Sequence, residues 1–314
     1  MGNALAVTGL TGKKSGGAFA AKLHTHWDTV QTMFPGGVRA LVRQSSDTTR
    51  IRRILPELMI CSGSLEDEFF LRQALSGVDT LVHIAGIHLS RLLVRVAVDC
   101  GVRRLILVHT TGIYSKYKQA GEEYRKIDGE IQALCESSGT VLTILRPTMI
   151  YGDLSDNNVV RFIRMVDRLP FMPVVRGARY WLQPVWYEDL AEAYYRVLLR
   201  EKETGGRNYD LSGGAPILLR DMLSEIGTQL GKSRVRFVSF PFLLAYAAAV
   251  TLYGLSLGKI DYREKVQRLC EDRAYPHDAA AADFGYHPVA FAEGVRSEIR
   301  DYLALGSAEH SDNP

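Results

Sequence analysis

The sequence lacks several features that would place it in a specialised class. Its four cysteines, Cys61, Cys100, Cys135 and Cys270, are too far apart for a metal or redox motif, so we expect free thiols in a reducing compartment. The 38 basic residues nearly balance the 35 acidic ones, and the net charge of +3 does not indicate a nucleic-acid partner. HExxH, CxxC and nucleophile-elbow patterns do not occur, and we expect no metal.

Long hydrophobic runs are also scarce. No charged segment followed by an apolar run opens the sequence, so we expect no secretory signal and a cytoplasmic location. Residues 237–258 carry no charge, but Pro241 would start any helix there and leave fewer than the roughly 20 residues that a membrane span needs. Three interpretations stay open: a helix packed against protein, for example in a homodimer, a helix on the inner membrane surface, and a true span.

The first half of the sequence alternates short apolar runs with helical spacing. Strict alternation of strands and helices requires right-handed crossovers and a parallel sheet covered on both faces. We therefore expect an α/β protein with a Rossmann-type, doubly wound parallel sheet. The expected strands are residues 4–9, 38–43, 57–65, 79–86, 102–112 and 140–147.

The stretch VTGLTGKKSGG, residues 7–17, joins the first expected strand to the first expected helix. Gly9 permits a tight turn, Gly12 lets the backbone approach a pyrophosphate, and Gly16 or its neighbour lets the helix pack closely on the strand. The helix N-terminus adds amide donors and about half a positive charge. We interpret the stretch as a phosphate-binding loop, whose two lysines either flank phosphate oxygens or remain solvated.

Further motifs follow this loop in a recognisable order. They are SGSLED from Ser62, DTLVHIAG from Asp79, LRPTMIYG from Leu145 and LQPVWYEDLAEAYYRVL from Leu182. Together with the loop they resemble the extended short-chain dehydrogenase/reductase family, which contains NAD(P)-dependent epimerases and dehydratases. The resemblance covers nearly the whole chain.

The resemblance implies both an organisation and an activity. It implies an NAD(P)-binding domain at 1–150, with a returning segment near 180–200, and a smaller C-terminal substrate domain from 151–179 and 201–305. We expect a flexible tail at 306–314. The implied activity is an NAD(P)-dependent oxidoreductase or epimerase reaction on a hydroxyl or keto group of a sugar nucleotide or related polar substrate. The alternative is a non-catalytic NADP(H)-binding sensor or scaffold.

The end of the second expected strand bears on the choice of cofactor. NAD-binding sheets usually place an acidic residue there, whereas this chain has Arg43 and then Ser45. Because guanidinium binds a 2′-phosphate in a bidentate way, we expect NADP(H), while Asp47 keeps NAD(H) open. The cofactor-binding residues that we expect are Gly9, Thr11, Gly12, Gly16, Arg43, Ser45, Ser64, Leu65, Ala85, Gly86, Pro147 and Met149. Of these, Ser64 stands where the family has an acid near the adenine.

The family's chemistry uses a Ser or Thr beyond the fifth strand and a Tyr–Lys pair four residues apart on a helix. Thr110, in HTTGIY, has the spacing of the hydroxyl residue. If Glu130 is the acid that follows the lysine, then Lys126 takes the lysine role and Glu122 occupies the tyrosine position. Tyr124 is close, but residues two apart on a helix point in different directions. The candidate catalytic residues are Thr110, Tyr124 and Lys126.

Two alternatives to this assignment remain. Tyr114 and Lys118 have the standard spacing, but they follow the fifth strand directly, where the family has a loop. Glu122 could act as a base beside Lys126. Loss of the standard pair favours the non-catalytic interpretation.

Overall fold

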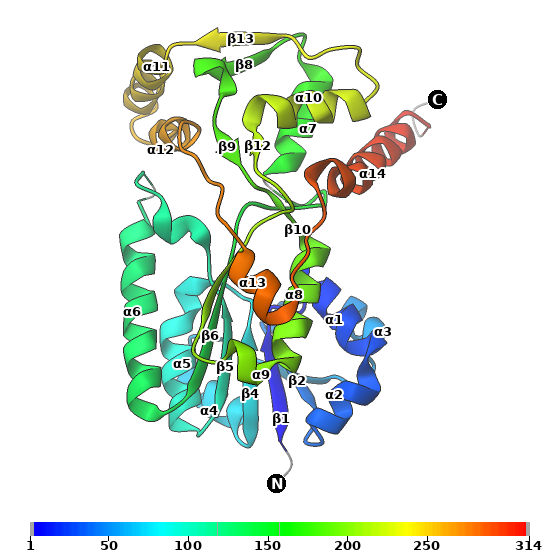
Figure 1. The fold of residues 1–314 in the computed structure, drawn as a ribbon, viewed down its shortest axis with the longest axis vertical. Helices are drawn as coiled ribbons and strands as arrows, with labels where there is room; N and C mark the ends of the chain where they lie inside the picture. The colour runs from blue at the N-terminus through cyan, green and yellow to red at the C-terminus, as the bar shows by residue number, and fades with distance from the viewer. Residues whose placement is uncertain (1–2, 118, 157, 312–314) are drawn as a thin grey trace.

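The larger half of the molecule is built around a seven-stranded, entirely parallel sheet (Figure 1). The computed structural model describes residues 3–117, 119–156 and 158–311. The strand order is β11-β6-β5-β4-β1-β2-β3, which confirms the expected Rossmann-type fold. The strands are β1 (Ala4–Thr8), β2 (Val38–Val42), β3 (Met59–Ser62), β4 (Val78–His83), β5 (Arg104–Val108), β6 (Val141–Pro147) and β11 (Asn208–Leu211).

The central strands are buried on both faces, as their continuous apolar sequences require. All five residues of β1 and all five of β5 are buried. The one charged residue among these ten is Arg104, whose guanidinium donates hydrogen bonds to the carbonyl oxygens of Val197 and Leu198 at 2.6 and 2.8 Å. The burial of this charge is therefore compensated by carbonyls at the end of a helix.

Helices cover both faces of the sheet. One apolar cluster joins β1 and β2 to one set of helices through residues such as Phe19 and Tyr194, and a second cluster on the other face includes Leu93 and Ile127. The helices of the first face are α1 (Ser15–Thr25), α2 (Trp27–Met33), α3 (Thr49–Ile54), α8 (Tyr187–Leu199) and α13 (Asp278–Phe284). Those of the second face are α4 (Glu68–Leu75), α5 (Ser90–Asp99) and α6 (Gly121–Ser138).

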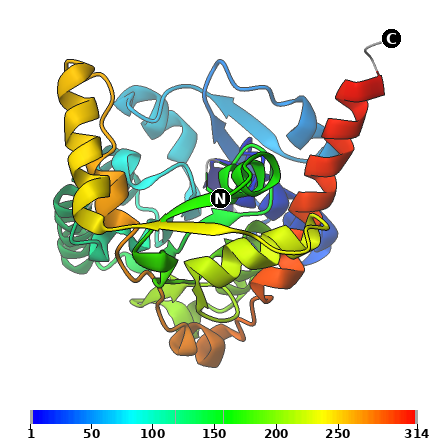
Figure 2. The ribbon, with the colours of Figure 1, turned by 90° about the horizontal axis from the view of Figure 1, so that it is seen from above.

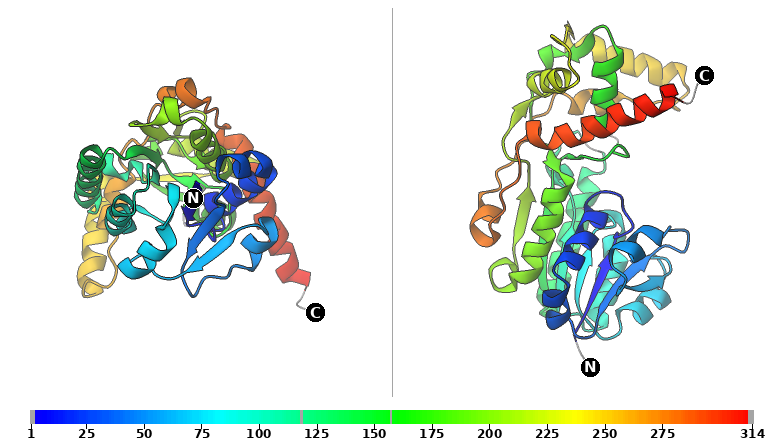
Figure 3. Two further views of the ribbon diagram at one scale, coloured as in Figure 1. Left: turned by 90° about the horizontal axis from the view of Figure 1, so that it is seen from below. Right: turned by 90° about the vertical axis from the view of Figure 1, so that its right-hand side faces the viewer.

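A smaller half stands above the carboxyl ends of the strands (Figures 1 and 3). Its apolar core includes Ile163, Met222 and Val295. The main elements are α7 (Val159–Arg168), α10 (Leu219–Gln229), α11 (Phe242–Leu255), α12 (Arg263–Arg268), α14 (Phe291–Ser311) and the parallel pair β8 (Met172–Val175) and β13 (Phe237–Phe240). Short elements complete the chain: α9 (Glu201–Thr204), β7 (Ile150–Tyr151), β9 (Trp181–Leu182), β10 (Val185–Trp186), β12 (Ile217–Leu218), η1 (Ile87–Leu89), η2 (Thr111–Tyr114) and η3 (Arg176–Ala178).

Two segments beyond residue 200 belong to the sheet-containing half. Strand β11 pairs with β6 at the edge of the sheet, and α13 packs on β11 and α8. The larger half thus extends further along the chain than the expected returning segment, residues 180–200. Helix α14 continues to Ser311 through part of the expected tail, and residues 312–314 lie outside the described part.

The uncharged segment 237–258 forms β13 and then α11. Ala249 is the single buried residue of α11, so packing within this chain does not cover the helix. Within the described residues, no helix is both long enough and apolar enough to cross a bilayer. Of the three interpretations, contact with a second molecule or with a membrane surface stays open.

Candidate functional site

The loop between β1 and α1 is tightly packed, and glycine makes this packing possible. Gly9 has a φ of +82°, in the left-handed region that favours glycine. A Cβ atom on Gly16 would lie 2.1 Å from the carbonyl oxygen of Gly9, and one on Gly12 would lie 3.1 Å from it. The first turn of α1 contains no acidic residue. These residues fit a dinucleotide diphosphate, because the backbone can approach it and the helix N-terminus favours negative charge.

A cleft of about 710 Å³ lies along this loop, where the strand order reverses between β4 and β2. Arg43 and Ser46 line it at the end of β2, and Glu66 lines it after β3. Ligands of doubly wound sheets bind at such reversal points, at the carboxyl ends of the strands. The cleft is lined by eight of the expected cofactor-binding residues: Gly9, Thr11, Gly12, Gly16, Arg43, Ser64, Leu65 and Ala85.

The remaining expected cofactor residues lie elsewhere. Met149 lines a second cleft, while Ser45, Gly86 and Pro147 are outside the lining of both. Ser46, which follows Arg43 and Ser45 in the sequence, does line the first cleft, whereas sequence reasoning missed Glu66. Glu66 supplies an acid two residues beyond Ser64, and a search for an acid slightly further along the loop would have found it.

The second cleft, of about 350 Å³, adjoins the first, and Lys14 lines both. Thr110 and Gln183 line it on one side. Arg268 lines it from the end of α12, and Arg273 and Tyr275 line it from the segment that follows. Thr110 is fixed at the start of η2, where its Oγ1 accepts a hydrogen bond from the backbone N–H of Gly112 at 3.0 Å. The second cleft therefore brings together side chains that are far apart in the sequence.

Cationic groups dominate the far wall of the second cleft. Burial and, to a smaller extent, the neighbouring Arg268 together lower the pKa of Arg273 to about 10. The Nε atoms of both arginines are buried and lack a hydrogen-bond partner within the described part of the chain. Buried donors without partners are costly, so this wall is suited to an anionic or strongly polar ligand group.

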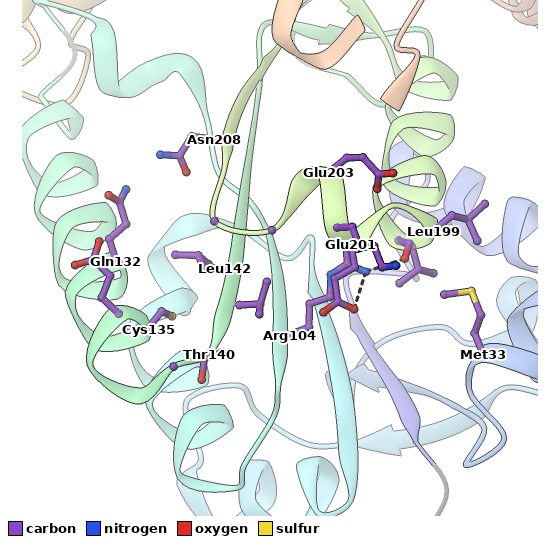
Figure 4. Close-up of a pocket in the computed structure, with 17 residues that line it drawn as sticks. Met33, Arg104, Gln132, Cys135, Thr140, Leu142, Leu199, Glu201, Glu203 and Asn208 are labelled. Carbon is purple, nitrogen blue, oxygen red and sulfur yellow. Dashed lines mark hydrogen bonds and ion pairs between the residues drawn. The ribbon is translucent and has the colours of Figure 1, made fainter. Parts of the chain in front are cut away.

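A larger cleft, of about 900 Å³, lies at the opposite end of the sheet (Figure 4). It lies at the amino-terminal ends of β5 and β6, between α6 and α9, with Arg104 and Glu201 pointing toward each other at 4.0 Å. Glu136 and Glu203 also line it. This cleft is remote from the glycine-rich loop and does not belong to the dinucleotide site.

Comparison with known proteins agrees with this geometry. Residues 35–169 match the family model of NAD(P)H-binding domains. Over 107 residues, 34% of this chain, the sequence is 30% identical to the mitochondrial NADH dehydrogenase [ubiquinone] 1 alpha subcomplex subunit 9 of Arabidopsis thaliana, and the match spans 26% of that protein. Over 245 residues it is 25% identical to the 4-hydroxy-2-methyl-3-oxo-4-farnesyl-3,4-dihydroquinoline-1-oxide ketoreductase of Stigmatella aurantiaca, covering 68% of this chain and 71% of that one.

Solved structures share the whole fold. The dTDP-glucose 4,6-dehydratase DesIV of Streptomyces venezuelae, with NAD bound, superposes with a TM-score of 0.71 at 19% identity, over 96% of this chain and 97% of that one. The NADPH complex of the quinone oxidoreductase QOR2 of Escherichia coli gives a TM-score of 0.68 at 20% identity, over 93% and 98%. This chain has an NAD(P)H-binding domain and the extended short-chain dehydrogenase/reductase fold.

The α6 helix separates the candidate catalytic residues, instead of presenting them on one face as the expected Tyr–Lys pair requires. Tyr124 is buried, and its hydroxyl lies 3.1 Å from Nε2 of His88. Lys126 is exposed, and neither residue lines a cleft, whereas Thr110 does. The structure does not bring the three candidates together. Of the alternative pair, Tyr114 donates a hydrogen bond to Asp210 at 3.0 Å, and Lys118 lies outside the described residues.

The buried acid of α6 is Asp128 rather than Glu130. Its carboxylate contacts His109 Nδ1 at 2.5 Å and accepts a hydrogen bond from Arg146 at 2.7 Å. Burial raises the pKa of Asp128, but these two partners outweigh burial and hold the pKa below its usual value. Glu130 instead forms an exposed ion pair with Arg91. If Asp128 is the acid that follows the lysine in the expected pattern, the lysine position falls on Tyr124.

Proposed function

We propose that the protein is an NADP(H)-dependent oxidoreductase that acts on a hydroxyl or keto group of a polar, negatively charged small molecule, such as a sugar nucleotide. The observation that carries this proposal is the pair of adjoining clefts with a common wall at Lys14. One has the features of a dinucleotide site, and the other is lined by the Thr110 hydroxyl and by two arginine side chains. Two molecules bound in these clefts would be in contact with each other.

The choice of NADP(H) is supported by the end of β2. Arg43 and Ser46 line the first cleft there, and Arg43 is exposed and free to turn toward a phosphate. A guanidinium group pairs with a 2′-phosphate, which is present in NADPH and absent from NADH. NADH stays the alternative, because the acidic Asp47 follows Arg43 closely in the sequence.

The side chains of the second cleft have distinct roles in this proposal. When a keto group is reduced, a bound NADPH would supply the hydride and solvent would supply the proton to the oxygen. The Thr110 hydroxyl hydrogen-bonds the reacting oxygen and orients it, while Arg273 and Arg268 bind the negatively charged part of the substrate. Thr110 thus acts at the reacting centre, and the arginines act in binding.

A test follows from this division. The protein is incubated with NADPH and a panel of sugar nucleotides, ketones and quinones, and loss of NADPH absorbance is measured. We expect Thr110→Val to lower kcat for any compound turned over and Arg273→Gln to raise KM. Thr32→Val is the matched control, because Thr32 is exposed on α2 and bonds only its own helix.

A second candidate function is NADP(H) binding without turnover. It is favoured by the burial of Tyr124 and the exposure of Lys126, which separate the residues expected to transfer the proton. NADPH binding without consumption or conversion of any panel compound would support this candidate. A protein that binds neither NADPH nor NADH would contradict both candidates.

A further inference from the structure

Helix α11 presents an unusually large apolar surface. Leu243, Leu244 and Leu255 have exposed fractions of 77%, 62% and 80%, and Leu257 just beyond the helix reaches 88%. At about 100° per residue, the three helical leucines and the exposed Val250 span an arc of about 140° of the helix circumference. Solvent-facing helices are normally polar on the exposed side, so a surface of this kind marks a contact with another molecule or with lipid.

Basic residues surround this apolar surface. Residues 231–268 contain seven Lys or Arg and only two acidic residues, a net charge of +5, whereas the whole chain has a net charge of +3. The rest of the chain is therefore slightly acidic. Arg234 and Arg236 precede β13, and Lys259 follows α11; all three are exposed.

Two further arginines lie over aromatic rings near the two ends of α11. The guanidinium carbon of Arg176 is 5.5 Å from the ring centroid of Phe242, and that of Arg263 is 3.9 Å from the centroid of Tyr253. Aliphatic stems can follow an apolar helix in this way while the charged groups remain at its border. An apolar helix flanked by cations and aromatic rings matches the boundary between lipid tails and anionic headgroups.

The position of α11 leaves it accessible from outside. It stands at the outer edge of the smaller half, on the opposite side from α14 (Figure 2). Within the described residues its main packing partner is α12, which ends at Arg268 in the wall of the second cleft. The apolar helix and the second cleft are thus joined by one short connection.

We propose that α11 and its basic border dock the protein on an anionic membrane surface, with the apolar side chains inserted among the lipids. The helix has 14 residues, or about 21 Å at 1.5 Å per residue, which is shorter than the roughly 30 Å of a bilayer core. It therefore lies in the interface. A two-fold dimer through α11 is less favourable, because the symmetry would bring the basic borders of two copies near each other.

Vesicle co-sedimentation of the full chain tests this proposal. We expect binding to phosphatidylcholine vesicles that contain phosphatidylglycerol, weaker binding to pure phosphatidylcholine, and weakening by added salt. Leu243→Asp combined with Leu255→Asp should reduce binding at least roughly tenfold. Lys259→Glu should reduce it by roughly fivefold or more on anionic vesicles only. Phe69→Asp, at an apolar residue 71% exposed on α4, is the matched control and should bind like wild type.

Light scattering on the same samples separates the alternatives. A monomer that binds anionic vesicles supports the proposal. A dimer that dissociates in the double leucine variant, with no vesicle binding by either form, would show that a second copy covers α11 and would overturn the proposal. Equal binding of the wild type to neutral and anionic vesicles would also overturn the proposal. So would a loss of binding in Phe69→Asp as large as that in the double leucine variant.

Discussion

The hydroxyl of Tyr124 lies 3.1 Å from Nε2 of His88, and the two rings meet edge to face with centroids 5.0 Å apart. This contact joins α6 to the segment that follows β4, at the border of the dinucleotide cleft. Tyr124, a candidate for proton transfer, thus has its hydroxyl in contact with another side chain of the protein. The contact gives a direct way to separate a structural role of Tyr124 from a chemical one.

Tyr124→Phe should lower stability more than it lowers turnover. Removing the hydroxyl leaves the imidazole of His88 without this partner, at a cost of about 1 kcal/mol in the free energy of unfolding. Because Tyr124 lines neither cleft, we expect kcat to stay close to the wild-type value. Denaturant unfolding and steady-state kinetics measure the two effects. A large fall in kcat with unchanged stability would instead assign Tyr124 the predicted catalytic role. Ser137→Ala is the matched control, because it removes an exposed α6 hydroxyl that bonds only its own helix.

Arg43→Ala should weaken binding of NADPH and leave binding of NADH nearly unchanged. Loss of a charged hydrogen bond to a partly exposed phosphate corresponds to roughly a tenfold rise in the dissociation constant. Titration by nucleotide fluorescence gives both constants. Arg53→Ala is the matched control, because Arg53 is an exposed arginine on α3 outside the cleft. Equal NADPH affinity of the Arg43 variant and the wild type would contradict the choice of NADP(H).

Gly16→Ala and Gly129→Ala should have opposite effects on stability. A Cβ at Gly16 would collide with the carbonyl oxygen of Gly9, whereas a Cβ at Gly129, on the exposed side of α6, would meet nothing within 4 Å. We expect the first change to destabilise the protein and abolish dinucleotide binding. The second should raise the free energy of unfolding by about 0.5–1 kcal/mol, because alanine favours the helix. Thermal unfolding with and without NADPH measures both; a Gly16 variant with wild-type binding would refute the role given to the loop.

Glu298 should make stability fall as the pH rises. Burial raises the pKa of this carboxyl, the nearby Asp156 raises it further, and the N–H of Gly152 donates to it. Above the ordinary pKa of glutamate, Glu298 therefore stays protonated in the folded state, whereas it is ionised in the unfolded state. The stabilisation is complete below that range and is lost as the pH rises through the raised pKa of the folded protein.

Urea unfolding from about pH 5 to about pH 9 tests this dependence. Glu298→Gln keeps an acceptor for Gly152 and carries no ionisable proton, so its stability should fall less steeply than that of the wild type. Glu293 is exposed at the start of the same helix, and Glu293→Gln is the control. Parallel curves for wild type and Glu298→Gln would show that another group controls the pH dependence.

The sheet could be predicted from the sequence because its strands are continuous apolar runs between glycine-rich turns. All six expected strands are present, but the edge strand β11, only four residues long and half polar, has too weak a pattern to be recognised. The dinucleotide loop could also be predicted, because its glycines stand where the backbone needs a positive φ or a close approach. Eight of the expected cofactor residues accordingly line the first cleft.

Most residues that line the second cleft could not be predicted from the sequence. Arg273 reaches it from a loop about 160 residues beyond Thr110, and local periodicity does not report such a contact. For a related reason, the sequence of α6 did not show which of its acidic residues is buried. Asp128 and Glu130 are equally acidic in sequence, and only the tertiary contacts with His109 and Arg146 bury the first of them.

The position of Lys14 on the boundary of two cavities makes one ammonium group common to both ligands. A phosphate that neutralises this charge from one side changes the electrostatic potential felt from the other. Binding in either cleft would therefore alter the affinity of the other cleft for an anionic ligand, and the effect would be reciprocal.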